Sequence, residues 1–350
     1  MYMRVLYWGS LSWGSTSLAR FRAMTQLADD VYGVDSSALL GEYLYRSVVQ
    51  RVQIRLCWPP LIHRLAVELK RESDRYCPTC VWIDQGFQIP GDALKDVRAT
   101  TGATLIHFSL DSLTAPGTSS RSFADAIGQY DYCVTTKAHE LAYYRQLGAR
   151  SVLLGSEGVD PDIHRPVNMS AVDTERFGCD VVFIGQAMRR RADLMASVAL
   201  RTTASVKIYG RGWHRTLQRY GLGHLAHGWA FGDEYAYALC GAKIALGILN
   251  ESVGDQQTTR CFEIPACGTF MLAQRTPALC ELFRESIEAT YFDSEEELTD
   301  KVRFYLAHET ERNHIALAGF KRVQTIRCSW RDRLVSLLDQ MRIALASTPR

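Results

Sequence analysis

Two acids, two hydroxyls and an arginine lie close enough along residues 254–274 to share one anion-binding site. The stretch reads GDQQTTRCFEIPACGTFMLAQ. The hydroxyl of Thr258 or Thr259 can cap a short helix, and TFMLA then follows as a buried strand. Backbone N–H groups at a helix start carry partial positive charge and suit a phosphate or diphosphate. We expect Arg260 in the first turn of this helix and Glu263 about one turn further along.

Polar side chains also follow expected strands in the first half of the chain. Residues 81–84 and 104–108 read as parallel strands, and His107 and Asp111 fall at or just beyond the end of the second. Ligands of doubly wound sheets collect at the carboxyl ends of strands. Asp111 is therefore a candidate to align an acceptor hydroxyl, the alternative being a helix cap or turn residue. His107 is a candidate to assist it, the alternative being a core histidine inside the strand.

Alternating strands and helices are expected to position these groups. An apolar strand at 4–8, a helix over 18–28 and a strand at 31–34 form a β-loop-α-β opening of the Rossmann kind. Residues 180–185 restart the alternation with a near-continuous apolar strand, as a parallel sheet covered on both faces requires. Glycine and proline punctuate the chain before it, which predicts a linker near 160–178.

Residues 254–274 resemble the donor-site signature of GT-B glycosyltransferases of the group-one clan, in particular the CgeB-like (spore maturation protein) branch. An acid-x7-acid pair flanks the nucleotide sugar in those enzymes, and Asp255 and Glu263 match that pair. The resemblance implies that Glu263 binds the ribose hydroxyls. It also implies that the diphosphate is bound by Thr258, Thr259 and Arg260. RCFEIPACGTFML is the most specific part of the match, which continues through TPALCELF, YFDSEEEL and VRFYLAHETERNHIALAG. The alternative is a helix-strand unit of some other α/β domain with chance polar residues.

The resemblance adds further donor-binding candidates. Arg189, Arg190 and Arg191 begin a helix after the 180–185 strand, and a basic residue there is similar to one that neutralises the donor diphosphate. A solvated charge run is the alternative for any single arginine. The segment His227-Gly-Trp-Ala resembles the loop beside the nucleotide base, and Gly210, at the end of the preceding strand, joins the donor-binding set.

The fold implied by the resemblance is GT-B: two Rossmann-like domains that face each other across a cleft. The expected domains are an acceptor domain over 1–165, a donor domain over 166–328 and a C-terminal helix over 329–350 that returns to the first domain. Enzymes of this branch place an acid or a histidine facing the acceptor. The implied catalytic residues are Asp111, His107 and Asp255.

The implied activity is transfer of a hexosyl or pentosyl group from a nucleotide-diphosphate sugar to a glycan or another hydroxyl acceptor. Retention at the anomeric carbon and no requirement for a metal or other cofactor also follow from the resemblance. Three alternatives remain: the same chemistry on a modified DNA base, a nucleotide-sugar epimerase, and a non-catalytic structural protein of the same fold. The sequence does not choose the sugar, the base, the acceptor or the oligomeric state.

Composition bounds these interpretations. The chain has 350 residues and a formal net charge of +2, so nothing in its charge demands nucleic acid or an acidic membrane surface. No apolar run approaches the ~20 residues of a membrane span, and the first residues do not read as a signal peptide. Ten cysteines without regular spacing favour reduced thiols and a cytoplasmic location. Cys77 and Cys80 form a CxxC pair, but no second ligand pair accompanies them, so we interpret them as two loop thiols.

Overall fold

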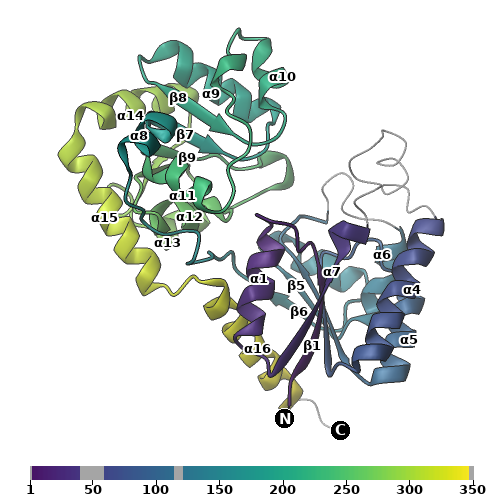
Figure 1. Cartoon of the computed structure of the whole chain (residues 1–350). Coiled ribbons are helices and arrows are strands. Elements are labelled where there is room, and N and C mark those ends of the chain that lie inside the picture. The colour runs from purple at the N-terminus through teal and green to yellow at the C-terminus, as the bar shows by residue number, and fades with distance from the viewer. Residues whose placement is uncertain (1, 40–58, 114–120, 347–350) are drawn as a thin grey trace. The chain divides into compact units, whose positions relative to one another are not determined.

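Two parallel β-sheets, each covered by helices, organise the chain (Figure 1). The computed structural model describes residues 2–39, 59–113 and 121–346. The chain divides into two compact units, Met1–Glu157 with Trp330–Arg350, and Gly158–Ser329. The division falls several residues before the expected domain boundary at 165/166.

The first unit contains a six-stranded sheet in the order β2-β1-β3-β4-β5-β6, and all of its strand pairs are parallel. Its strands are β1 (Arg4–Gly9), β2 (Asp30–Asp35), β3 (Cys80–Asp84), β4 (Thr104–Ser109), β5 (Tyr132–Thr135) and β6 (Val152–Leu154). The chain reverses its direction across the sheet between β1 and β3. Such a switch point leaves a crevice at the carboxyl ends of the two strands.

Alternate residues of these strands face two separate cores, which is why the strands read as continuous apolar runs. Leu6 and Ile83 pack with α4 (Pro59–Tyr76) and α5 (Gly91–Thr101) on one face. Val5 and Trp82 pack with α1 (Thr16–Thr25) and α16 (Trp330–Ala346) on the other. The C-terminal helix therefore belongs to the first unit, where it lies beside α1. Two shorter helices also lie in the described part of this unit: α6 (Arg121–Ala126) and α7 (Leu141–Gln146).

A buried ion pair fills the switch point of the first sheet. Arg20 of α1 donates from Nε and Nη2 to the carboxylate of Asp84, at 2.8 and 3.0 Å, and the two side chains are each 2% exposed. The Tyr7 hydroxyl donates to the same carboxylate at 2.6 Å. The Arg20 guanidinium also lies over the rings of Phe108 and Trp330, at 4.7 and 4.6 Å. This cluster ties α1 and α16 to the sheet.

The second unit contains a five-stranded parallel sheet in the order β11-β10-β9-β7-β8. Its strands are β7 (Cys179–Ile184), β8 (Val206–Tyr209), β9 (Ala242–Gly247), β10 (Met271–Gln274) and β11 (Thr290–Phe292). The first strand of this sheet again lies between the second and the third. The switch point is therefore at the carboxyl ends of β7 and β9.

Helices cover both faces of the second sheet. Val182 and Ile184 pack on the side of α8 (Ala171–Phe177), α11 (Asp233–Cys240), α12 (Arg260–Ala266) and α13 (Pro277–Leu282). Val181 and Phe183 pack on the side of α9 (Arg189–Arg201), α10 (Trp213–Gln218), α14 (Glu295–Ala307) and α15 (Glu309–Thr325).

Part of the expected linker at 160–178 is helical. The Ser170 hydroxyl accepts from the N–H of Asp173, whose carboxylate accepts from the N–H of Ser170. This capping box starts α8, so a helix of the second unit lies within the proline-punctuated stretch.

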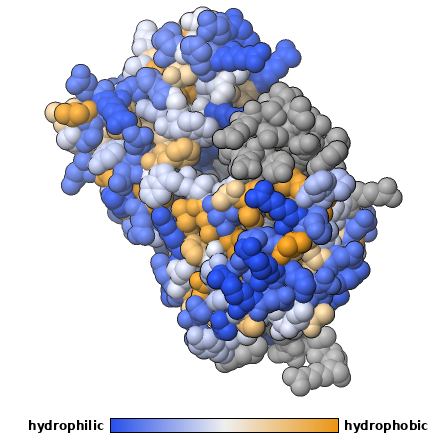
Figure 2. Space-filling model, turned by 45° about the vertical axis from the view of Figure 1, so that its right-hand side comes forward, coloured by the Kyte–Doolittle hydropathy of each residue, from blue (hydrophilic) through white to orange (hydrophobic). Residues whose placement is uncertain are grey.

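Most of the surface drawn in Figure 2 is hydrophilic, with smaller hydrophobic patches between the polar side chains. Within the described residues, no helix is long and apolar enough to cross a membrane.

Candidate functional site

Two guanidinium groups approach the Phe183 ring at the switch point of the second sheet. The Cζ atoms of Arg191 and Arg260 lie 5.6 and 5.3 Å from the ring centroid. Arg191 lies in the first turn of α9, which follows β7, and Arg260 begins α12, which follows β9. Backbone carbonyls just beyond β9 hold both: Arg191 Nε donates to Leu249 O at 3.4 Å, and Arg260 Nη2 donates to Ile248 O at 3.0 Å. The fold thus brings together two arginines that are far apart in the sequence.

Two positive charges lie close together at this arginine pair. Arg191 is 5% exposed. Burial lowers its pKa most, and the charge of Arg260 lowers it further, whereas the charge of Asp255 raises it. Within the described residues, the buried Nε of Arg260 has no hydrogen-bond partner. Two adjacent guanidinium groups, one of which keeps a buried N–H without a partner in the described part of the chain, favour binding of an anion.

The loop between β7 and α9 approaches the loop after β8 so closely that glycine is required. A Cβ on Gly210 would lie 2.1 Å from Gly185 O, and the φ of Gly210, +131°, is one that L side chains rarely adopt. A Cβ on Gly185 would lie 3.1 Å from Arg260 Nη1. The predicted residue Gly210 therefore shapes the backbone next to the arginine pair.

Glu263 is buried in the same unit and already has partners. It is 5% exposed and accepts a hydrogen bond from the Tyr235 hydroxyl, and His164 Nε2 lies 3.6 Å from its Oε1. His164 Nδ1 accepts from the N–H of Asp160 at 3.0 Å, so the proton of the neutral ring is on Nε2, facing the carboxylate. The charges of Glu263 and Arg260 both act on the pKa of Tyr235, which burial raises most. This places Glu263 and Arg260 in one neighbourhood.

The residues that precede Arg260 do not cap the helix as expected. Thr259 occupies the N-cap position of α12, but its side chain makes no capping hydrogen bond. The Thr258 hydroxyl lies 3.8 Å from the sulfur of Cys261, and both threonines are half-buried. Because α12 has only seven residues, its dipole adds little to the charge of the arginines.

The other donor-binding candidates lie on the surface. Arg189 and Arg190 are exposed, and Arg190 Nη1 lies 3.8 Å from a carboxylate oxygen of Glu295. His227 is exposed with its ring 5.7 Å from that of Tyr209, and burial of part of the ring lowers its pKa. Of the three consecutive arginines, the structure thus brings only Arg191 to Arg260.

Sequence reasoning missed Tyr235 and His164 and did not single out Arg191. A signal for Arg191 was present, because it shares the buried face of α9 with Leu194, Met195 and Val198 at helical spacing. No local pattern marks Tyr235 or His164, which only the fold places beside Glu263.

Asp111 lies exposed just beyond the carboxyl end of β4 in the first unit. Gln85, which follows β3, donates from Nε2 to Asp111 Oδ2 at 2.5 Å. The Asp111 N–H donates to the Ser109 hydroxyl at 3.1 Å. Asp111 is therefore held at the sheet edge where ligands of this fold class bind.

His107 lies in the core of the first unit and not at that edge. The residue is 0% exposed, its ring contacts those of Phe87, Phe123 and Tyr130, and its Nε2 lies 3.1 Å from the Tyr144 hydroxyl. The side chain points into the helix-covered face because strand residues alternate. The structure supports the core-histidine alternative, and a ring enclosed in this way cannot contact an acceptor.

Burial lowers the pKa of His107 from 6.5 to about 3. Between these two values the unfolded chain binds a proton that the folded protein excludes, so stability falls as the pH falls. The loss contributed by this group is up to ~1.4 kcal/mol per pH unit. We expect His107→Gln to have a shallower fall of the unfolding free energy between pH 6.5 and pH 4, measured by urea unfolding. The same substitution at the exposed His139 is the control, and equal slopes in wild type and His107→Gln would contradict the prediction.

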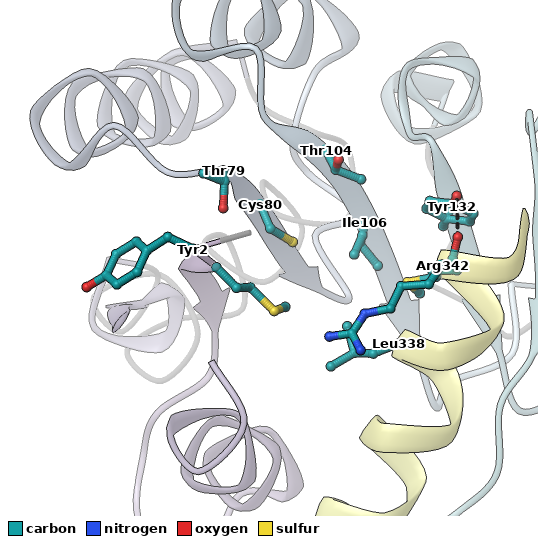
Figure 3. A pocket seen from close by; sticks show the side chains of 10 residues that line it. Tyr2, Thr79, Cys80, Thr104, Ile106, Tyr132, Leu338 and Arg342 are labelled. Atoms are coloured by element: carbon teal, nitrogen blue, oxygen red, sulfur yellow. Dashed lines mark hydrogen bonds between the residues drawn. The ribbon is translucent and has the colours of Figure 1, made fainter. Parts of the chain in front are cut away.

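A cavity of about 380 Å³ in the first unit lies at the opposite ends of the strands (Figure 3). Cys80 and Thr104, the first residues of β3 and β4, line it together with Leu338 and Arg342 of α16. The Tyr132 hydroxyl donates to Met341 O at 3.1 Å across one side. The lining is mainly apolar and does not include Asp111, so this cavity is not part of the expected site.

Residues 189–339 match the model of a family described as glycosyl transferase-like. The matched region includes both Arg191 and Arg260. No curated protein matches the chain in sequence.

Several solved structures share the fold over nearly the whole chain. The Anabaena protein HepE in complex with UDP-glucose has a TM-score of 0.66 at 12% identity, covering 99% of this chain and 100% of HepE. The sucrose-phosphate synthase of Thermosynechococcus elongatus has a TM-score of 0.69 at 12% identity, with the same coverage. A glycosyltransferase from Rickettsia africae has a TM-score of 0.65 at 11% identity, covering 99% of each chain. The predicted GT-B fold, with two Rossmann-like parallel-sheet domains, is confirmed.

Proposed function

We propose that this GT-B protein, with its glycosyl transferase-like region over 189–339, transfers a sugar from a nucleotide-diphosphate sugar to a hydroxyl acceptor. The observation that carries the proposal is the arginine pair, Arg191 and Arg260, at the β7/β9 switch point of the second unit. Two guanidinium groups there lie over one ring, and the charge of Asp255 acts on Arg191. A diphosphate supplies the negative charge that this arrangement lacks.

In the proposed reaction, the bond between the anomeric carbon and the diphosphate breaks, and negative charge grows on the departing phosphate oxygen. Arg260, whose buried Nε has no partner within the described residues, would stabilise that charge together with Arg191. We propose that these cations act without a metal ion. Asp111 would orient the acceptor hydroxyl. Asp255, whose charge acts on Arg191, would be a further catalytic residue. We also propose retention at the anomeric carbon, which the anomeric configuration of the product, read by NMR, would test.

Uridine nucleotides are the first donors to test. HepE, which shares the fold, was solved with UDP-glucose, with UDP and glucose, and with UDP. A hexosyl donor such as UDP-glucose is the matching first sugar. Membership of the CgeB-like branch and a cytoplasmic location remain predictions from the sequence.

The proposal is tested by thermal unfolding of the full chain with a panel of nucleoside diphosphates and nucleotide sugars. A ligand at 100 times its Kd adds about 2.7 kcal/mol to stability, so at least one member should raise the melting temperature clearly. Arg260→Ala removes one of the two proposed phosphate contacts and should reduce this shift. The absence of any shift across the panel in wild type would contradict donor binding.

Glu263→Gln keeps the shape of the side chain but removes its charge. If the carboxylate accepts from the ribose hydroxyls, donor affinity should fall by about 5- to 150-fold, which corresponds to ~1–3 kcal/mol. Isothermal calorimetry with the nucleoside diphosphate found in the panel measures this change. The exposed residue Glu281 allows the same substitution as a control. A wild-type Kd combined with a lower melting temperature would mean that Glu263 serves only to hold Tyr235 and His164.

Asp111→Asn should separate transfer from donor binding. Sugar transfer should fall by ~10²-fold or more, the usual loss for a general acid–base group. Donor affinity should stay at its wild-type value, because the proposed donor-binding residues belong to the other unit. Asp92→Asn, on a side chain that is 92% exposed, is the matched control in the same unit. A donor-binding defect in Asp111→Asn as large as that of Glu263→Gln would contradict its assignment to the acceptor.

A nucleotide-sugar epimerase and a transferase differ in their need for a second substrate. Incubation of the protein with the donor alone should leave the configuration of the sugar unchanged, apart from slow hydrolysis. Formation of an epimeric nucleotide sugar without acceptor would identify the epimerase alternative. A donor that binds but never reacts with any acceptor, DNA with modified bases included, would identify the non-catalytic alternative.

A further inference from the structure

Two cysteines meet at the C-terminal ends of α11 and α12, outside the proposed donor site. Cys240 is the last residue of α11, and Cys267 is the C-cap of α12. The Cys240 thiol donates to the carbonyl oxygen of Cys267 at 3.3 Å and lies 3.8 Å from Arg165 O. Neither cysteine is in a disulfide.

Both cysteines line a cavity of about 340 Å³ in the second unit. Lys243, Arg312 and Asn313 contribute polar side chains to the same cavity. Cys240 is half-buried, whereas Cys267 is 3% exposed. Cys240 is therefore the more accessible of the two cysteines, and its thiol is in contact with Cys267.

The two thiols have different acidities. The pKa of Cys240 is lowered despite its partial burial. The neighbouring Cys267 thiol lowers it most, followed by the N–H of Val167 and the charge of Arg165. The Cys240 thiol and burial raise the pKa of Cys267. Burial likewise raises the pKa of Cys133 and Cys179. Because the thiolate is the nucleophilic form and Cys240 is the more exposed of the two, Cys240 is the sulfur placed to react first.

We propose that Cys240 and Cys267 form an oxidation site that a hydroperoxide converts to an intramolecular disulfide. The Cys240 thiolate attacks the terminal oxygen of the hydroperoxide, the O–O bond breaks, and the alkoxide or hydroxide that leaves takes up a proton. The sulfenic acid formed on Cys240 is then attacked by the sulfur of Cys267, which loses its proton, and water leaves as the S–S bond forms. In total, two thiols are oxidised by two electrons and the peroxide bond is reduced.

The disulfide would join the ends of the two helices that carry Tyr235 and Glu263. The N–H of Cys267 also donates to Glu263 O at 3.1 Å within the last turn of α12. A bond at Cys267 therefore constrains the helix on which the Glu263 carboxylate is held. The inference itself concerns only the thiols and does not depend on the proposed transferase activity.

The test uses the full chain, treated with one equivalent of hydrogen peroxide and digested without reduction. The expected result in wild type is a peptide pair linked through Cys240 and Cys267, two hydrogen atoms lighter than the sum of its parts and released by dithiothreitol. Titration with a thiol reagent should show the loss of two thiols per chain. A linkage through Cys77 or Cys280, which are both exposed, or the retention of all thiols would overturn the proposal.

Variants separate the roles of the two sulfurs. In Cys267→Ser the sulfenic acid on Cys240 should persist and react with dimedone, whereas Cys240→Ser should lose no thiol at one equivalent. Cys280→Ser is the matched control and should behave like wild type. Absence of dimedone labelling at Cys240 in a folded Cys267→Ser protein would overturn the order of attack. The linked peptide of the wild type decides the inference even if a variant fails to fold.

Discussion

Arg260→Ala is expected to lower the rate of sugar transfer by about 10²- to 10³-fold, the usual loss when one preorganised donor to a growing negative charge is removed. The effect on turnover should exceed the effect on donor affinity, because the contact strengthens as the diphosphate departs. Steady-state kinetics with saturating donor, beside calorimetric donor binding, measure the two effects separately. An Arg260 that is only structural would lower the melting temperature and leave the kinetics of the folded protein unaltered.

Arg191 provides a second test of the same site. Because both guanidinium groups lie over Phe183, the losses in Arg191→Ala and Arg260→Ala should not add in the double variant. Arg190→Ala is the matched control, since this side chain lies on the same helix but is 50% exposed. Arg260→Lys should recover only part of the rate, because lysine keeps the charge without the planar fork of donors. Equal losses in Arg190→Ala and Arg191→Ala would mean that the wrong face of α9 has been assigned to the donor.

The largest expected effect on stability comes from the Arg20–Asp84 pair of the first unit. Removal of one partner leaves an uncompensated buried charge, and the usual cost is about 3–5 kcal/mol. We therefore expect Arg20→Met to lower the free energy of unfolding by this amount, as measured by urea unfolding at neutral pH. Asp84→Asn should have a similar effect, because both side chains are 2% exposed and Tyr7 loses a charged acceptor.

The double variant Arg20→Met, Asp84→Leu removes both charges and should cost less than either single change. The exposed pair Lys70–Asp74, at 3.1 Å, is the control, because surface ion pairs contribute only about 0–1 kcal/mol. Donor affinity of the folded single variants should remain at the wild-type value, since Arg20 and Asp84 lie in the first unit. A loss at Arg20 no larger than that at Lys70 would contradict the assigned role of the pair.

The sequence alone was sufficient to predict the type and position of several elements. The strands expected at 4–8, 81–84, 104–108 and 180–185 correspond to β1, β3, β4 and β7. Strands buried on both faces produce continuous apolar runs, which are visible in the sequence. These signals act over a few residues, which is why a single sequence contains them. The alternation of strands and helices then indicated two Rossmann-like units, and the resemblance of residues 254–274 to a known family implied the GT-B fold.

Which side chains meet was decided by the tertiary structure. The sequence offered Arg189, Arg190 and Arg191 together, but only the residue on the buried face of α9 reaches Arg260. His107 lies within β4, and because strand residues alternate between the two faces of a sheet, its side chain points into a core. Asp111 lies just beyond β4, where this alternation no longer applies, and it remains exposed at the carboxyl end of the strand. Glu263 lies beside Tyr235, which precedes it by 28 residues, and beside His164. Both partners lie outside the motif at 254–274. Contacts of this kind depend on how distant helices pack on a sheet, and no pattern within a short stretch of sequence encodes them.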